Sequence, residues 1–332
     1  MPRYLRDYRV DLLVDGKQSS IITYSTENTQ NPLHISFNCK FGKGPAEMTL
    51  DIFNMSPVSR SLLQSDDIKV RLQVGYRESE KPDVINLQTM FLGTCHTPLM
   101  TDVKGGDHQT KLFVTDGYEL QELKVNLEAK PDTTHVQVIK DIVNQIVSQS
   151  GGMLSADFTE LDAMGIKDIY PKGTSLIGVA HQVLEERLRM HNIKFSVVRG
   201  VIKIYQDNST TRTRIHDISL KTGLLDIPKP VVNKATHAFS NPNSTKAFNF
   251  KTLANPELIP LEKVRLSHES LESHYDLIID EVTHSGGYEA NQWYSKVRAS
   301  YKADKDPGKS IAEAKWKQNQ ENIEYFKLLT NS

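Results

Sequence analysis

The chain has 332 residues, of which 38% are hydrophobic and 24% are charged, as in an ordinary soluble globular protein. This length predicts two or three domains and is sufficient to bury a sizeable core. The 40 lysine and arginine residues nearly balance 41 acidic residues, giving a net charge of -1. This balance argues against a basic nucleic-acid-binding surface spread over the whole chain, because phosphate binding draws on clustered positive charge.

Cysteine content and hydropathy restrict the compartment that the chain is expected to occupy. Cys39 and Cys95 are the only cysteines, which excludes a disulfide scaffold and favours folding in a reducing cytoplasm. The charged segment 1–7 lacks the apolar core of a signal peptide. No stretch approaches the roughly 18 apolar residues that span a bilayer. We therefore expect a soluble chain without a secretion signal and without stable membrane association.

Residues 1–126 predict an all-β domain. Apolar and polar residues alternate in three runs, 8–14, 35–41 and 68–76. This period is typical of strands with one buried and one wet face. Glycine-containing turns separate the runs. Between the second and third runs, Ser56-Pro57 opens a short predicted helix that reaches Leu63.

Residues 131–206 predict a small α+β domain. Apolar residues at helical spacing indicate a first helix over about 136–147, with a cap at 132–134 and a stop at 151–152. A second helix is predicted after Thr174-Ser175, and its buried stripe would contain Leu176, Val179, Ala180, Val183 and Leu184. The final element is a predicted hairpin whose two strands flank a turn at Arg199-Gly200.

A polar linker is predicted at 207–214, and strand patterns resume over 215–302. Within this region, the centre of the predicted strand 275–282 is interpreted as buried on both of its faces. The remaining residues, 303–332, form a polar tail and a predicted C-terminal helix. The predicted fold class is therefore mainly β with an α+β insertion, in which two β domains flank a small mixed domain. The apolar side chains of the C-terminal helix could pack on the chain itself or dock on a partner, and they include Trp316, Phe326 and Leu329.

Motifs that carry catalysis are missing from the sequence. It contains no nucleophile elbow, no zinc-binding His-Glu-x-x-His helix, no phosphate-binding glycine loop and no Cys-x-x-Cys pair. The glycine-rich segment 42–44 is interpreted as a turn. We therefore predict no catalytic, cofactor-binding or metal-binding residue, no cofactor and no enzymatic activity.

One group of titratable residues is close enough in sequence to suggest a metal or acid–base cluster. On a strand, Asp280 and His284 would share one face while Glu281 would point away, and a metal would still need a third ligand. A hydrogen-bonded structural histidine is therefore favoured. Three acidic residues near the predicted helices are interpreted as solvated: Asp157, Glu160 and Asp162.

Aromatic and basic residues alternate from Trp293 to Arg298. This pattern could stack bases or bind single-stranded DNA. The preferred interpretation is an ordinary alternating strand, with Trp293 and Val297 inside and Tyr294 and Arg298 outside.

The order of several short motifs carries a resemblance to a known family. It rests first on a strand, an Asn-x-Ser/Thr-Pro helix start and a strand ending in Gly-Tyr, at 51–57 and 70–76, and then on the strand at 91–94. The paired helices, the closing hairpin, the turn at Asn255-Pro256 and the sequence from His284 to Trp293 follow in the family's order. Over most of 8–302 the chain resembles the baseplate hub proteins of tailed phages. These include the late control protein D type and the hub portion of type VI secretion spikes.

The resemblance implies a fold and a function. Family hubs carry two tail-tube-like β-barrel domains per chain, so that three chains present six similar barrels. This implies a homotrimeric ring of pseudo-sixfold symmetry that joins the sixfold tail tube to the threefold central spike. The implied partners are the tail tube protein, the central spike protein, the tape measure protein and other baseplate proteins, with DNA only in transit through the lumen. The implied location is the virion tail or baseplate, after assembly in the host cytoplasm.

Functions of other classes remain as alternatives. A tail-associated peptidoglycan hydrolase would need a pair of carboxylates in a cleft. A host-binding tail adhesin would bind bacterial surfaces as an isolated chain. A further structural alternative is a tube-end adaptor or distal tail protein with a different symmetry.

Overall fold

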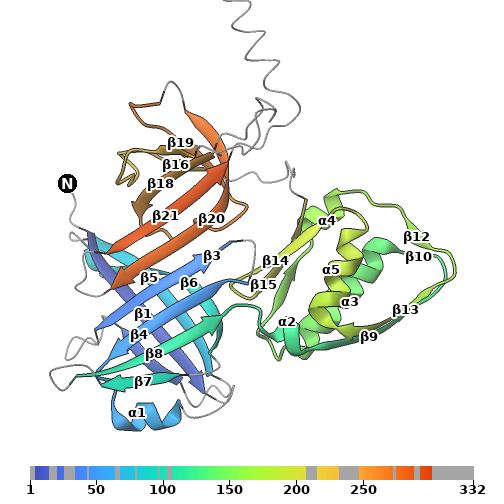
Figure 1. The fold of residues 1–332 in the computed structure, drawn as a ribbon, viewed down its shortest axis with the longest axis horizontal. Helices are drawn as coiled ribbons and strands as arrows, with labels where there is room; N and C mark the ends of the chain where they lie inside the picture. The colour runs from blue at the N-terminus through green and yellow to red at the C-terminus, as the bar shows by residue number, and fades with distance from the viewer. Residues whose placement is uncertain are drawn as a thin grey trace, which may run out of the picture.

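The protein is described by a computed structural model that covers residues 4–14, 21–25, 34–42, 45–63, 68–78, 81–95, 98–102, 107–206, 215–231, 247–271, 274–287 and 292–300. The predicted linker, the C-terminal tail and helix, and residues 43–44 of the predicted turn lie outside these residues. The chain is mainly β with a helical insertion, which confirms the predicted fold class. Figure 1 shows the β units on one side and the α+β unit projecting from them.

The first β unit contains one small helix among its strands. The strands are β1 (Tyr4–Val14), β2 (Ile21–Ser25), β3 (Ile35–Phe41), β4 (Glu47–Phe53), β5 (Ile68–Glu78), β6 (Lys81–Cys95), β7 (Leu99–Asp102) and β8 (His108–Thr115). Hydrogen bonds connect them in the order β3-β4-β8-β6-β5-β1-β2, with β7 also beside β8. The predicted helix is confirmed as α1 (Pro57–Leu62), where Ser56 caps the first turn by accepting a 3.1 Å hydrogen bond from the Ser59 backbone.

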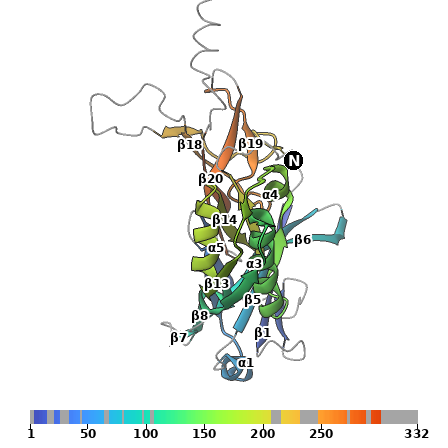
Figure 2. The same cartoon turned by 90° about the vertical axis from the view of Figure 1, so that its right-hand side faces the viewer.

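The α+β unit is built from short strands and two main helices. Its elements are α2 (Glu119–Glu122), β9 (Lys124–Ala129), β10 (Thr133–Thr134), α3 (His135–Gln149), β11 (Ser155–Asp157), α4 (Thr159–Ala163), β12 (Ile169–Tyr170), β13 (Thr174–Val179), α5 (Ala180–Arg189), β14 (Lys194–Val198) and β15 (Val201–Tyr205). The first predicted helix is confirmed as α3, which Thr134 caps. Helices α3 and α5 lie side by side, as Figures 1 and 2 show.

The second helix of this unit begins later in the chain than the sequence predicts. Residues 174–179 form β13, which pairs antiparallel with β9, and α5 begins only at Ala180. The segment is rich in β-branched residues and contains Gly178, both of which disfavour a helix. The hairpin is confirmed: Arg199 and Gly200 both have positive φ, 55° and 74°, as the tight turn between β14 and β15 requires.

The last β unit contains β16 (Ile215–Ile218), β17 (Lys229–Val231), β18 (Ala247–Leu253), β19 (Lys263–Leu266), β20 (Tyr275–Gly287) and β21 (Trp293–Ser300). The run 275–282 is not buried on both faces as predicted, because Ile278 is half-exposed between buried neighbours. The register between β20 and β21 shifts at Asp280. This bulge reverses the alternation, so Ile279 and Val282 both face the core, and the prediction that Asp280 and His284 share a face is wrong.

The two β units are joined by the pairing of β3 with β20. Six residue pairs connect these strands, from Val282 opposite Phe41 to Gly287 opposite Ser36. The result is one 14-stranded sheet, in which β18, β21, β20, β3, β4 and β8 are consecutive neighbours, as Figure 1 shows. Among the described residues, hydrogen bonding runs from β17 at one end to β2 at the other without a pair that closes the ends. Closure of the strands into the expected barrels is therefore not detected in the pairing of the described strands.

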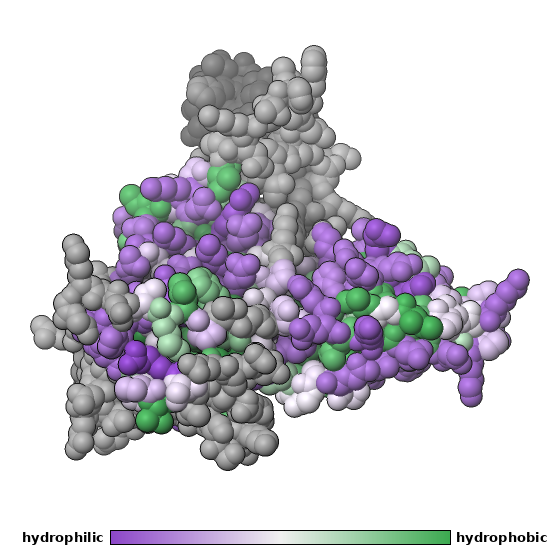
Figure 3. All heavy atoms as spheres, turned by 60° about the horizontal axis from the view of Figure 1, so that its bottom comes forward, coloured by the Kyte–Doolittle hydropathy of each residue, from purple (hydrophilic) through white to green (hydrophobic). Residues whose placement is uncertain are grey.

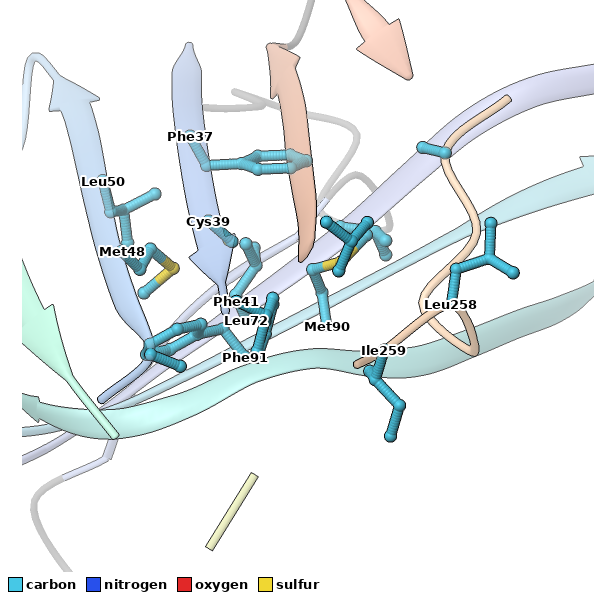
Figure 4. Close-up of a cluster of buried hydrophobic side chains, with 14 of the residues drawn as sticks. Phe37, Cys39, Phe41, Met48, Leu50, Leu72, Met90, Phe91, Leu258 and Ile259 are labelled. Carbon is cyan, nitrogen blue, oxygen red and sulfur yellow. The ribbon is translucent and has the colours of Figure 1, made fainter. Parts of the chain in front are cut away.

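Apolar side chains form two separate cores. One core contains buried residues from both β units, including Phe37, Phe41 and Phe91 from the first and Leu258 and Ile259 from the last. Figure 4 shows several of these side chains converging between the strands. The second core belongs to the α+β unit and lies around α3 and α5. We propose that the chain divides into three domains, at 1–126, 131–206 and 215–302, followed by a C-terminal segment at 303–332.

The β3–β20 joint contains a glycine with no room for a side chain. A Cβ atom on Gly286 would lie 2.4 Å from Cζ of Phe37 and 2.9 Å from Cε3 of Trp293, two rings that form an edge-to-face pair. We expect Gly286→Ala to destabilise the protein by about 1–3 kcal/mol, because both rings must shift within a packed core. A lowered thermal unfolding midpoint would show this. Gly42→Ala is the matched control, since its Cβ would meet only Cγ of Glu281 at 3.5 Å. Equal midpoints for the two variants would contradict this prediction.

Candidate assembly face

The six consecutive strands shared by the two β units have a common outer face, and of the two rows of residues that follow only Ser285 at the joint is buried. Directly paired residues lie on the same face of a sheet, so the registers define rows that cross all six strands. One row contains Lys251, Lys296, Thr283, Lys40, Glu47 and Thr115. The next contains Leu253, Tyr294, Ser285, Asn38, Thr49 and Phe113. Within this row, the Asn38 amide donates a 3.0 Å hydrogen bond to Ser285 Oγ across the joint. We call this surface the assembly face.

Opposite charges face each other at several places on the assembly face. Arg298 is directly opposite Glu281, and Lys40 is directly opposite Glu47. Asp51 lies opposite Lys111, with 3.7 Å between its Oδ1 and Nζ. Such cross-strand pairs neutralise one another locally, so the face as a whole carries mixed charge.

Two lysines depart from this arrangement. Lys251 and Lys296 are direct cross-strand partners, and like charges in that position repel. Both ammonium groups lie over the ring of Tyr294, at 3.9 Å and 5.5 Å from its centroid. The electron-rich face of the ring attracts both cations and offsets part of the repulsion.

The prediction that 293–298 is a strand with alternating buried and outer residues is confirmed. Trp293 and Val297 are buried, Tyr294 is half-buried and Arg298 is exposed. Trp293 therefore belongs to the core and is not available to stack a base.

The core side of the same sheet carries a buried polar row at the joint. His284 is fully buried, directly opposite Cys39 in β3 and Ser295 in β21. Its Nε2 lies 3.1 Å from the Leu258 carbonyl oxygen, which can only accept a hydrogen bond. Nε2 therefore carries the proton, and Nδ1 accepts the 2.7 Å hydrogen bond from Ser295 Oγ. Ser295 Oγ in turn accepts from the Asn255 backbone at 3.1 Å, so the structural interpretation of His284 is confirmed.

A second buried polar group fixes the α+β unit to both β units. Asp116, directly after β8, is buried and accepts hydrogen bonds from the backbone N–H groups of Arg199 and Gly200 at the hairpin turn. The Arg199 guanidinium donates to the Pro256 carbonyl in the loop after β18. Three units of the chain therefore meet at this junction. Burial raises the pKa of Asp116 to about 7, although the two N–H groups and the charge of Arg199 act in the opposite direction.

The other acidic residues considered from the sequence do not converge on one place. Asp157 accepts a 3.1 Å hydrogen bond from the backbone of Thr159 at the start of α4. Hydrogen bonding from the side chain of Thr159, and then from its backbone, lowers the pKa of Asp157. The exposed Asp162 forms a 2.5 Å ion pair with Lys140. Glu281 lies on the assembly face, away from His284. The structure thus separates Asp280, Glu281 and His284 and does not form a cluster from them.

Sequence reasoning missed two groups of exposed apolar residues at opposite edges of the shared sheet. At the β7–β8 edge, Leu99, Met100 and Phe113 are 49%, 39% and 49% exposed. Beyond β18, Leu225 and Ile227 are 46% and 60% exposed in the segment that leads into β17. Its backbone is attached to β18 by the hydrogen bond from Leu225 N to Lys251 O. Figure 3 shows mainly hydrophilic residues from below, with hydrophobic areas on the first β unit and on the α+β unit.

Three solved structures share this fold over nearly the whole chain. The tail protein from Neisseria meningitidis MC58 matches with a TM-score of 0.54 and 9% identity, covering 89% of this chain and 96% of that one. The 43 kDa tail protein of prophage MuSo2 from Shewanella oneidensis has a TM-score of 0.55 and 8% identity, with 88% and 98% coverage. An E. coli component of the type VI secretion system, itself similar to T4 bacteriophage tail proteins, has a TM-score of 0.52 and 12% identity, with 88% and 77% coverage.

These likenesses define the class of fold. The chain has the fold of phage tail proteins and of a type VI secretion component, as the resemblance in the sequence implies. No protein-family model and no curated protein matches the sequence itself. Within the described residues, no helix combines the length and apolar character needed to cross a membrane.

The buried histidine predicts a pH dependence of stability. Burial, followed by the charge of Arg199, lowers the pKa of His284 to about 3, whereas in the unfolded chain it stays near its ordinary value. Between these values the unfolded state binds one more proton, so stability is lost as the pH falls. From pH 7 to pH 5 we expect a loss of about 2 kcal/mol from this group.

Unfolding of the wild type and of His284→Gln at both pH values measures this contribution. The glutamine retains an amide N–H for Leu258 but does not titrate. We expect the wild type to lose more stability than the variant on acidification. Parallel losses in the two proteins would contradict the assignment.

Proposed function

We propose that the chain is a structural, non-enzymatic hub of a phage tail or phage-like injection machine. Three copies would form a ring of pseudo-sixfold symmetry that joins the sixfold tail tube to the threefold central spike. The observation that carries the proposal is the six-stranded sheet to which each β unit contributes three neighbouring strands. One chain would thereby supply two sheet segments to the ring. The fold shared with tail proteins supports this assignment.

The two apolar edges support a ring in which copies meet head to tail. Leu99 and Met100 lie in β7, which among the described strands pairs only with β8, and Leu225 and Ile227 lead into β17 at the opposite end of the shared strands. Phe113 lies on the neighbouring assembly face of β8. A contact between unlike edges is heterologous, and such contacts close into a ring when the rotation between copies permits. Exposed apolar residues at both edges would then be buried in each copy-to-copy interface.

The assembly face has the properties expected of a channel wall in this proposal. Its acidic residues pair across strands with cations, so passing DNA would meet few free positive charges at which to bind. The lysine pair over Tyr294 is the local exception. The channel would admit the tape measure protein and then DNA, which would only pass through the lumen.

The remaining partners follow from the position of a hub. The tail tube protein would contact one side of the ring, and the central spike protein the other, with other baseplate proteins around it. The ring would reside in the virion tail or baseplate after assembly in the host cytoplasm. The fold shared with a type VI secretion component that is itself similar to T4 bacteriophage tail proteins supports a place in a machine of this kind.

The edges can be tested with single charged substitutions. We expect Leu99→Asp and Ile227→Asp each to convert a trimer of the 37.5 kDa chain to monomers, because each would bury an unpaired carboxylate in the interface. Light scattering coupled to size-exclusion chromatography measures the mass. Ile177→Asp is the matched control: Ile177 is 75% exposed in β13 of the α+β unit, so the trimer should persist.

Several outcomes would overturn the proposed function. A stable hexamer or a monomeric wild type at high concentration would contradict the trimer. Trimers that survive both edge substitutions would contradict the interface. Lysis of bacterial cell walls by the purified chain in a turbidity assay would show an enzyme instead of a purely structural hub.

A further inference from the structure

Three segments of the α+β unit bring two histidines and an aspartate together. His135 is the first residue of α3, and Asp168 immediately precedes β12. His191 lies in the turn between α5 and β14. The three side chains each offer a ligand atom, and these atoms lie within 4.8 Å of one another. These three residues belong neither to the assembly face nor to the buried polar groups described above.

The two imidazole rings are held in direct contact. His135 Nδ1 lies 2.8 Å from His191 Nε2, and the rings meet edge to face with centroids 4.9 Å apart. Asp168 Oδ2 lies 3.6 Å from His191 Nδ1. The His135 ring also stacks on Tyr170 at 4.0 Å, and its backbone N–H donates a 2.9 Å hydrogen bond to the Asp168 carbonyl.

We propose that His135, His191 and Asp168 form a binding site for a divalent transition-metal ion, for which Zn²⁺ is the best match. Imidazole nitrogen and carboxylate oxygen are common Zn²⁺ ligands, and three protein ligands leave a fourth position for water. Neutral imidazole is the form that binds a metal. Burial, and then the proximity of His191, lowers the pKa of His135.

Small side-chain movements suffice to form the site. Two ligands of a tetrahedral Zn²⁺ are roughly 3.3 Å apart, given a bond length of about 2.0–2.1 Å. The two imidazole nitrogens, now 2.8 Å apart, therefore need to separate by about half an ångström, and the rings need to turn so that both lone pairs face the ion. The Asp168 side chain is 67% exposed, so it can rotate towards the metal without disturbing the core. The stacking on Tyr170 limits rotation of the His135 ring.

The bound ion would brace the far end of the α+β unit. It would cross-link the start of α3, the segment before β12 and the turn after α5, which are distant in sequence. In the metal-free form, a hydrogen bond between the two ring nitrogens holds the same contact. A metal would replace this hydrogen bond as its hydrogen moves to the other nitrogen of the same ring.

Titration of the full chain with ZnCl₂ after removal of metals tests the site. Calorimetry should show one ion per chain with a roughly micromolar or tighter dissociation constant, and the thermal midpoint should rise with Zn²⁺ concentration. We expect His135→Ala and His191→Ala to weaken binding by more than about 100-fold, and Asp168→Asn by about 10-fold. Asp168→Asn changes an exposed side chain, so its fold is expected to be intact.

His181→Ala is the matched control. His181 lies in the adjacent helix α5 and forms a 3.8 Å contact with Glu185, away from the cluster. Its removal should leave Zn²⁺ affinity unchanged. Absence of saturable Zn²⁺ binding by the wild type would overturn the proposal, as would unchanged stoichiometry and affinity in a folded His135→Ala/His191→Ala double variant. Weakening by His181→Ala equal to that of the cluster variants would also overturn it.

Discussion

The pairing of β3 with β20 holds the two β units together and sets the position of every other strand in the shared sheet. It connects residues that are 241 to 251 positions apart in the chain through six consecutive residue pairs. The pairing aligns rows of mainly polar side chains on the outer face of the sheet and rows of buried side chains on its core face. Without it, each β unit would expose an unpaired sheet edge and an uncovered part of the common core. The assembly face exists only because this one register is chosen, since a shift by one residue would reverse every side chain.

Buried polar groups make the arrangement of the three units specific. His284, Ser295 and the backbone of Asn255 satisfy one another beside the joint. Asp116 and Arg199 connect the hairpin turn of the α+β unit to both β units. A buried donor or acceptor that loses its partner costs about 1–3 kcal/mol, so an alternative packing of the units would be penalised at several atoms together.

The proposed roles are distributed over separate parts of the molecule. The shared sheet and its two edges would form the channel wall and the contacts between copies. The α+β unit has its own core and carries the proposed metal site at the segments that flank α3 and α5. A metal there would stiffen a unit that the Asp116 junction attaches to the sheet. Substitutions can therefore alter the assembly face and the proposed metal site independently of each other.

Local periodicity and turn chemistry are enough to predict the mainly β class, the capped helices α1 and α3, the Arg199-Gly200 hairpin and the alternation from Trp293 to Arg298. The pairing of residues 174–179 with β9 and the bulge at Asp280 depend instead on the folded structure. The folded structure also sets the β3–β20 register and brings His135 beside His191, 56 residues away. These features depend on contacts between distant segments, whose energies leave no periodic signal in the chain.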